Sequence, residues 1–182
     1  MFRPLRSPST SATRSRRPRL PPIALAWLAG LCGVIAACDG PVGPLPGGRL
    51  RGEDAPCAVD WRGRDAEREV ELEVSPDAPR SVRIWNVVED GRLFVPGDFL
   101  TPAKRWPHQV MADPRVRLRI AGELFRCEAR RVTDPAQIDA LRREAARKYA
   151  LAPDGWAARS EVWWFELLPR AEDAPVRASE TR

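Results

Sequence analysis

Two segments of the chain alternate strictly between charged and apolar residues, and this pattern constrains the fold more than any other feature. Residues 69–74 read Glu-Val-Glu-Leu-Glu-Val, and residues 115–120 read Arg-Val-Arg-Leu-Arg-Ile. Because successive side chains of a strand point to opposite faces, each segment predicts a strand with one apolar and one charged face. Such strands are typical of antiparallel sheets. We expect the three glutamates to form a solvated face rather than a catalytic group.

Further strands and two helices complete a mainly β (α+β) fold. Residues 81–88 and 92–95 flank Asp90-Gly91, which favours a hairpin, and residues 123–133 form another strand. The last strand, residues 160–168, is apolar on both faces and is expected to be central or covered by a helix. The total of about six strands predicts a small, mainly antiparallel barrel with helices at its ends.

The helices are marked by their start signals. Asp134 followed by Pro135 predicts a long helix that ends near Ala150. A short helix is expected from about Pro107 and is ended by Asp113-Pro114.

The first 38 residues carry the parts of an export signal. Six arginines and no acidic residue precede an apolar run from Ile23 to Ala37, and Cys38 follows two alanines directly. The segment resembles a bacterial lipoprotein signal with its lipobox. This resemblance implies a signal peptide over residues 1–37 and a diacylglycerol on the sulfur of Cys38. Asp39 resembles the signal that retains lipoproteins at the inner membrane, so we expect the periplasmic face of that membrane.

Other interpretations of this region are open. The apolar run could remain as an anchor, although it is shorter than the ~20 residues that span a bilayer. Cys32 could carry the lipid, but Leu31 before it is large for a lipobox. Ser15-Arg16-Arg17 resembles the start of a twin-arginine signal, whose pathway exports folded, cofactor-loaded proteins; the alternative is an ordinary arginine-rich region.

Removal of the signal changes the charge of the chain. Residues 1–37 hold six of the 30 Lys+Arg and none of the 25 Asp+Glu, so the mature part has 24 bases, 25 acids and a net charge of −1. A nearly neutral domain lacks the basic surface that nucleic-acid binding requires, so we expect no nucleic-acid partner.

The mature chain divides into three parts. Residues 38–56 are rich in proline and glycine and are expected to be a tether, residues 57–170 to be the folded domain, and residues 171–182 to be a disordered tail. Cys57 and Cys127 remain in the domain, and the exported compartment permits a disulfide between them; the alternative is two buried thiols.

The residue inventory excludes several kinds of site. The chain has one histidine, no Cys-x-x-Cys, no Gly-x-Ser-x-Gly and no phosphate-binding loop. We therefore predict no metal ligands and no catalytic side chains, and if the protein is an enzyme we expect a cofactor to supply the chemistry.

One segment combines cations, an aromatic ring and a helix start. Lys104 and Arg105 stand where the short helix would begin, which suits a phosphate, and Trp106 could stack on a planar ring. The alternative is a solvated cationic pair beside a core tryptophan.

Seven residues of this region carry a resemblance to a known family: Trp106, Gln109, Val110, Ala112, Asp113, Pro114 and Val116. Their order resembles that of the split β-barrel flavoproteins, namely the pyridoxamine-phosphate-oxidase-like proteins and the related deazaflavin-dependent nitroreductases. The resemblance spans roughly residues 68–168.

The resemblance implies a split β-barrel that binds FMN or a deazaflavin in a cleft, often across a homodimer. It assigns the cofactor phosphate to Lys104 and Arg105, and the lining of the cleft to Trp106 and His108. Arg83 and Trp85 on the neighbouring strand are further candidates. The glycine-rich strand-turn of the nitroreductases is missing, and Pro107 stands where the family often has an aromatic residue.

Two functions follow as hypotheses. The first is a membrane-tethered periplasmic reductase that uses a flavin-type cofactor on a small-molecule substrate. The second is a non-catalytic envelope lipoprotein that uses the same barrel as a ligand-binding or structural module.

Overall fold

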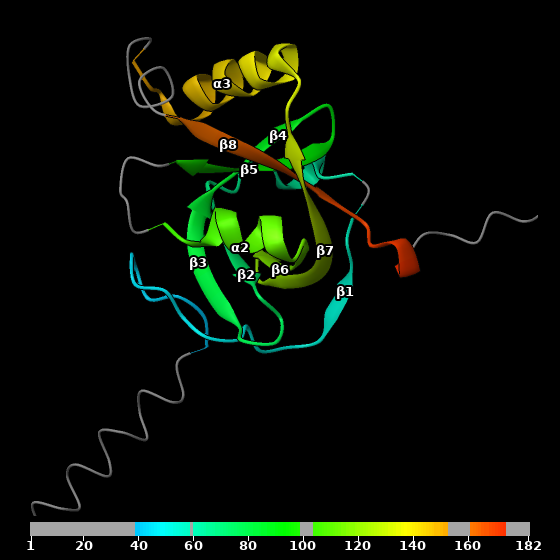
Figure 1. Ribbon diagram of the computed structural model, residues 1–182. Helices are drawn as coiled ribbons and strands as arrows, with labels where there is room; N and C mark the ends of the chain where they lie inside the picture. The colour runs from blue at the N-terminus through cyan, green and yellow to red at the C-terminus, as the bar shows by residue number, and fades with distance from the viewer. Residues whose placement is uncertain (1–38, 59, 99–103, 153–160, 174–182) are drawn as a thin grey trace, which may run out of the picture. The chain divides into compact units, whose positions relative to one another are not determined.

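The computed structural model describes residues 39–58, 60–98, 104–152 and 161–173 (Figure 1). Its elements are β1 (Asp54–Pro56), η1 (Arg62–Arg64), β2 (Glu69–Val74), β3 (Arg80–Trp85), β4 (Val87–Glu89), β5 (Arg92–Asp98), α2 (Trp106–Ala112), β6 (Arg115–Ile120), β7 (Glu123–Val132), α3 (Pro135–Tyr149), β8 (Val162–Leu168) and η2 (Ala171–Asp173).

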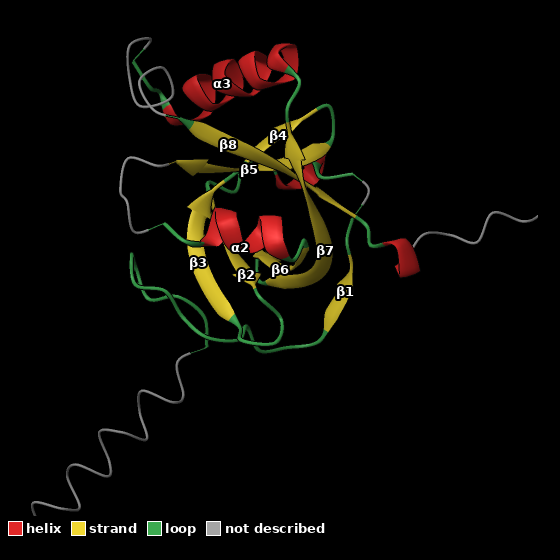
Figure 2. Ribbon diagram, viewed as in Figure 1, coloured by secondary structure: helices red, strands yellow, loops and turns green. Residues whose placement is uncertain are grey.

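The strands form one curled sheet in the order β3-β2-β6-β7-β8-β5-β4, with β1 added parallel to β7. All other pairings are antiparallel. The sheet curls enough for β3 to contact β5, near the other end of the strand order. Figure 2 shows the curled strands, with α2 at the centre of the view and α3 beside β8 and β4. The predicted mainly-β split barrel with one short and one long helix is confirmed, and β1 is a short strand added to the expected six. The single strand predicted for residues 81–88 is wrong, because the chain breaks at Asn86 into β3 and β4, which lie at opposite ends of the strand order.

The two faces of the sheet bury two separate apolar cores. The inner core lies inside the barrel and includes Trp106, Val116, Leu118 and Phe165. The outer core lies between the sheet and α3 and includes Phe94, Leu141, Tyr149 and Trp164. Because β8 contributes Phe165 to one core and Trp164 to the other, its predicted two-sided burial is confirmed.

The long helix begins and ends as its sequence predicts. The Asp134 carboxylate accepts a hydrogen bond from the backbone N–H of Gln137, which satisfies one of the free donors of the first turn. Ala150 follows the helix with a φ of 52°, the left-handed conformation common at helix ends. Within the described part of the chain, no helix has the length and hydrophobicity needed to cross a membrane.

Of the three glutamates of β2, only Glu69 is exposed as the alternation suggested, whereas Glu71 and Glu73 are not part of a solvated face. Glu73 is only 2% exposed, and its carboxylate lies 3.1 Å from Nη1 of Arg117. Glu71 lies 2.9 Å from Nη1 of Arg119. The register pairs Glu71 with Arg119 and Glu73 with Arg117 on the adjacent strand β6, so the two charged faces combine into one. We call Glu71, Glu73, Arg117 and Arg119 the ladder.

The segment predicted to be a tether covers this ladder. The carbonyl oxygens of Leu50 and Gly52 accept hydrogen bonds from Arg117, at 2.6 and 3.3 Å. Asp39 accepts two from Arg119 at 2.9 Å, and Leu50 is fully buried. The prediction of a tether over residues 38–56 is therefore corrected for residues 39–56, because the arginines of β6 hydrogen-bond the backbone of the segment and fix it on the sheet.

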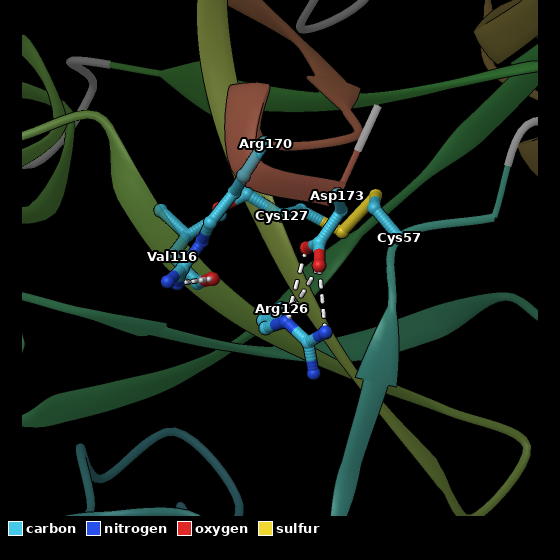
Figure 3. The surroundings of a disulfide bond; sticks show 6 residues. All are labelled: Cys57, Val116, Arg126, Cys127, Arg170 and Asp173. Atoms are coloured by element: carbon cyan, nitrogen blue, oxygen red, sulfur yellow. Dashed lines mark hydrogen bonds and ion pairs between the residues drawn. A yellow bond between two sulfur atoms is a disulfide. The ribbon is translucent and has the colours of Figure 1, made fainter. Parts of the chain in front are cut away.

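A disulfide joins Cys57 to Cys127, with a Cα–Cα distance of 4.9 Å (Figure 3). It closes a loop of 70 residues and links the chain after β1 to β7. In the chain-entropy model such a loop contributes about 4 kcal/mol. Beside it, the guanidinium of Arg170 donates to the carbonyl oxygens of Cys127 and Val116, at 3.1 and 3.0 Å.

The start of the predicted tail is also folded. Residues Ala171–Asp173 form a 3-10 turn, and the Asp173 carboxylate lies 2.6 Å from Nη2 of Arg126 (Figure 3). The ordered chain thus extends past the predicted limit at residue 170, while residues 174–182 of the predicted tail lie outside the described residues.

Candidate functional site

A groove of about 300 Å³ lies between the outer face of the sheet and the start of α3. Three arginines line it, Arg92 from β5 and Arg130 and Arg131 from β7. The remaining lining residues are Phe94, residues 132–134, Gln137 and Glu166. We call this site the arginine groove. Its volume is at the lower end of the range for small-molecule sites.

Glu166 is the buried centre of the groove. It pairs with Arg130 at 2.9 Å and with Arg92 at 3.5 Å, while its own side chain is 7% exposed. The register explains the contacts, because Glu166 of β8 lies opposite Arg130 on one side and Phe94 on the other. A buried carboxylate needs such partners, since an unpaired charge in this position would be strongly destabilising.

A chain of side-chain hydrogen bonds connects the groove to α3. Arg92 donates to the Gln137 side-chain oxygen at 2.7 Å, and the Gln137 amide nitrogen donates to Glu89. The guanidinium of Arg92 also covers the ring of Phe94, 5.1 Å from its centroid. These contacts hold Arg92 in place.

The other two arginines keep most of their hydrogen-bonding capacity. The Arg130 side chain is 65% exposed, and its bond to Glu166 uses Nη2. Arg131 makes no ion pair with any described residue and instead lies over the Trp163 ring, 3.8 Å from its centroid. A guanidinium has five N–H donors arranged for carboxylate or phosphate, so Arg130 can bind an anion in the groove. Arg131 is paired with Phe165 and points to the opposite face of the sheet, where its guanidinium lies over Trp163.

Trp163 lies beside the start of α2. It pairs with Gly97 of β5, and its ring meets His108 edge-on at 5.1 Å between centroids. Its indole nitrogen donates to Glu161 at 2.7 Å. Arg131 therefore lines the groove as part of the end of β7, while its guanidinium belongs to an aromatic cluster with Trp163 and His108 on the inner face.

The structure places the predicted stacking residue Trp106 in the inner core. Trp106 is 3% exposed and lies against Phe165, with 5.5 Å between the ring centroids. Gly97 permits this packing, because a Cβ at that position would lie 2.7 Å from Cγ of Pro107 and 3.2 Å from the Trp106 ring. This burial agrees with the alternative interpretation, in which Trp106 is a core residue. Trp106 therefore has no exposed ring face on which a cofactor could stack.

Two polar atoms on α2 are buried without a partner. Nε1 of Trp106 and the side-chain oxygen Oε1 of Gln109 make no hydrogen bond with any described residue. One is a donor and the other an acceptor. Buried polar groups are normally paired, so these two atoms form an unsatisfied polar spot on the buried side of α2.

The other predicted cofactor residues are not gathered around Trp106. Trp85 stacks on Tyr149 in the outer core, with centroids 4.4 Å apart. Arg83, 40% exposed, pairs with Glu71 at 3.2 Å. Lys104 is half-buried, and the exposed Arg105 directly precedes α2. At seven residues, α2 is too short to serve as an anion-binding helix start by its dipole.

A polar cluster fixes the far end of α3. The Tyr149 hydroxyl oxygen lies 2.5 Å from the carbonyl oxygen of Arg68, to which it donates, and 2.8 Å from that of Asn86, and it accepts from the backbone N–H of Asn86 at 3.0 Å. Burial raises the pKa of this phenol. Nζ of Lys148 lies 3.0 Å from the side-chain oxygen of Asn86 and 3.4 Å from Asp65, and burial lowers its pKa. These bonds position α3 on the sheet and, with it, the wall of the groove.

Sequence reasoning missed the groove, although it left two signals. Glu166 is the single charge within the apolar segment 162–168, which predicts a buried carboxylate with cationic partners. Arg130 and Arg131 are adjacent cations near the end of a strand. In the described residues, no group of three or more His, Cys, Asp or Glu could hold a metal ion.

Comparison with known proteins finds no matching family model and no matching curated sequence. Solved structures with similar folds include the heme storage protein HutZ from Vibrio cholerae, at 15% identity and a TM-score of 0.48 over 59% of this chain and 84% of that one. An FAD-binding protein from Mycobacterium smegmatis is 17% identical, with a TM-score of 0.41 over 63% of this chain and 91% of that one. An F420-H2 dependent reductase is 16% identical, with a TM-score of 0.43 over 55% of this chain and 93% of that one. At these values the similarity transfers neither a ligand nor an activity.

Proposed function

We propose that the protein is an exported, lipid-anchored split-barrel protein that binds an anionic, flavin-type cofactor, FMN or a deazaflavin, and acts as a reductase. One observation carries the proposal: on the inner face of the sheet the Arg131 guanidinium lies over the Trp163 ring, 3.8 Å from its centroid, and His108 meets the same ring edge-on. A phosphate and a planar ring are the two parts that such a combination suits.

Two donors at the end of β7 fit a phosphate. Arg130, held by Glu166, has free N–H groups on the groove face, while Arg131 has no carboxylate partner among the described residues and lies on the face of Trp163. Arg131 would bind the anionic tail of a cofactor whose ring lies beside Trp163, and Arg130 would bind an anion in the groove. Trp163 and His108 would lie beside the ring, whereas Trp106 is too buried for the stacking role that the sequence suggested.

The chemistry would come from the cofactor. A bound flavin supplies hydride or electron transfer, for which the chain needs no nucleophile or general base of its own. The residues of the protein would bind and orient the cofactor and shield it from water on the groove side. The substrate would be a small molecule, and the homodimer that the resemblance implies would bring a second copy to the site.

The anchor belongs to the same proposal. Cys38 would carry the lipid, and Asp39 after it would keep the protein on the periplasmic face of the inner membrane. The direct check is the mass of the N-terminal peptide from the purified protein, which should be that of a lipid-modified cysteine at position 38.

Flavin titration of the purified mature lipoprotein in detergent tests the cofactor. We expect FMN or a deazaflavin to quench the protein fluorescence, and its absorption band to remain with the protein through desalting. Arg130→Ala with Arg131→Ala should weaken binding at least ten-fold, about 1.4 kcal/mol or more, because the candidate phosphate donors on both faces of β7 are lost. Arg62→Ala with Arg143→Ala, both exposed, removes the same charge elsewhere and should leave affinity unchanged.

A third variant separates two locations for the cofactor. Lys104→Ala with Arg105→Ala tests the site that the family resemblance implies. If this variant loses flavin binding and the Arg130→Ala with Arg131→Ala variant does not, the phosphate-binding site lies at the start of α2. Equal affinity in all variants would reject both locations.

The second candidate is a non-catalytic binding module, and one observation favours it. Glu166 already neutralises part of the charge of Arg92 and Arg130, so the groove can serve as a structural ion-pair cluster or take a smaller anion. Absence of flavin binding, together with a stable envelope protein partner in cross-linking experiments, would favour this function.

A further inference from the structure

The turn at residues 42–45 exposes two large apolar side chains. Val42 is 60% exposed and Leu45 is 66% exposed. Two backbone hydrogen bonds, of 3.1 and 3.0 Å, join these residues to each other across the turn. Among the described residues, Met111 is the only other large apolar side chain with comparable exposure, at 52%. A single exposed apolar residue is ordinary, but two held together at the tip of a turn form a small apolar surface.

The chain on both sides of this turn is fixed to the barrel. Before it, Asp39 accepts hydrogen bonds from Arg119 and from the backbone N–H of Arg51, at 2.9 and 2.7 Å. After it, Gly47 exchanges two backbone hydrogen bonds with Ser81 of β3, at 2.9 and 3.0 Å. A Cβ on Gly47 would lie 2.0 Å from the carbonyl oxygen of Gly40, so the two ends of the turn meet closely.

The turn also lies within short reach of the proposed lipid. Val42 is four residues beyond Cys38, and four extended residues span at most about 14 Å. The acyl chains on Cys38 would be inside the bilayer. The apolar pair must then lie close to the bilayer surface, and residues 39–41 are too short and too firmly bound to hold it away.

We propose that the turn at residues 42–45 is a membrane contact, in which Val42 and Leu45 enter the boundary between lipid headgroups and acyl chains. This inference rests on the lipid anchor proposed above. Apolar side chains at this depth bind by burial of their surface, and the exposed Arg49 and Arg51 on the same segment suit anionic headgroups.

The contact would give the barrel a fixed orientation instead of a free tether. In Figure 1, residues 39–50 lie at the lower left of the barrel and α3 lies at the top. The arginine groove, beside the start of α3, would therefore face away from the membrane and into the aqueous compartment. A soluble ligand could enter it without crossing the lipid surface.

A dye at position 45 tests the contact. In the mature lipoprotein Cys38 would be acylated and Cys57 and Cys127 are joined, so Leu45→Cys supplies the single free thiol. The labelled full mature protein is placed in phosphatidylethanolamine–phosphatidylglycerol vesicles. We expect the emission of an NBD dye at position 45 to shift to the blue, to rise several-fold and to be quenched by nitroxide lipids. The matched control is Ala136→Cys at the exposed start of α3, whose dye should stay water-like.

The outcomes distinguish the inference from the anchor on which it rests. The mass of the N-terminal peptide is measured on the same preparation. A lipidated protein whose dye responds at position 45 but not at 136 supports the contact. A lipidated protein with the same water-like dye at both positions overturns it while the anchor stands. An unmodified Cys38 overturns both. Val42→Cys provides an independent second position if Leu45→Cys fails to fold.

Discussion

The ladder and the arginine groove both combine arginines and glutamates from neighbouring strands, yet only the ladder is covered. In the ladder, the Arg117 side chain is 14% exposed and that of Arg119 is 20% exposed. In the groove, Arg92 and Arg130 are 41% and 65% exposed. The difference comes from residues 39–52, whose carbonyl oxygens accept the free donors of Arg117 and Arg119.

This difference separates a structural ion-pair network from a site that can bind a ligand. A guanidinium most of whose donors are occupied by backbone and carboxylate oxygens has little capacity left for an anion. The Arg130 side chain lies where no described segment covers it, so its free donors face water and remain available to a ligand. The same residue types thus have different roles because one part of the sheet is covered and the other is open.

Removal of Arg117 should have the largest effect. Arg117→Met leaves the buried Glu73 carboxylate without its cation and should lower the free energy of unfolding by about 3–5 kcal/mol. Urea unfolding measures this loss. The double variant Arg117→Met with Glu73→Gln should recover most of it, because the amide still accepts from the Leu50 N–H without a charge. A single variant within about 0.5 kcal/mol of the wild type would show that the ladder is not an ion pair in solution.

Glu166→Gln, the corresponding change in the groove, should destabilise the protein less than Arg117→Met and should strengthen the binding of an anionic ligand. Glu166→Gln keeps the shape but weakens the bonds to two exposed arginines, which water can solvate, so we expect a loss of about 1–2 kcal/mol. Removal of the negative charge should at the same time raise affinity for a phosphate-bearing ligand, measured by titration with FMN. Weaker binding in this variant would mean that Glu166 positions Arg130 for the ligand rather than competing with it.

The contact at Asp39 predicts a smaller, pH-dependent effect. The backbone N–H of Arg51, and then the Arg119 guanidinium, hold the pKa of Asp39 below its usual value. Because the folded pKa is the lower one, the stabilisation is complete above the unfolded pKa of about 3.9 and is lost as the pH falls through the folded pKa. Asp39→Asn should therefore cost less than about 1 kcal/mol at neutral pH and nothing in strong acid, as measured by urea midpoints across pH. A difference that persists in acid would contradict this linkage.

The smallest effect is expected at the exposed edge of the ladder. Arg83 is 40% exposed and pairs with Glu71, which Arg119 also holds. Arg83→Ala should change the free energy of unfolding by less than about 0.5 kcal/mol in thermal or urea unfolding. The variant also tests Arg83 as the cofactor residue that the sequence suggested. Reduced flavin affinity without loss of stability would show that Arg83 contributes to the cofactor site.

Much of the fold could be predicted because it depends on local patterns. The alternation in residues 69–74 and 115–120 gave two strands, and Asp134 with Pro135 gave the start of α3. The role of the charged positions could not be read in the same way. Alternation shows that Glu73 and Arg117 lie on the polar side of their strands, but not that β2 and β6 are neighbours or that residues 39–52 lie over them.

The candidate site was harder to predict than the fold. Lys104, Arg105 and Trp106 are adjacent in sequence, and this made them appear to be one site, yet Trp106 turns into the inner core. The groove instead joins Arg92, Arg130 and Glu166, which come from three strands far apart in the chain. Such a set has only two local signals, the isolated charge of Glu166 in an apolar strand and the adjacent cations Arg130 and Arg131.

The sequence by itself determined the strands, the two helices and a chain poor in catalytic side chains, because these depend on periodicity, start signals and composition. Only the tertiary structure decided which charges are buried, which are open, and that residues 39–56 fold onto the barrel. The physical reason is that burial and pairing depend on strand order and register, which join residues far apart in the chain, such as Asp39 and Arg119, 80 positions apart.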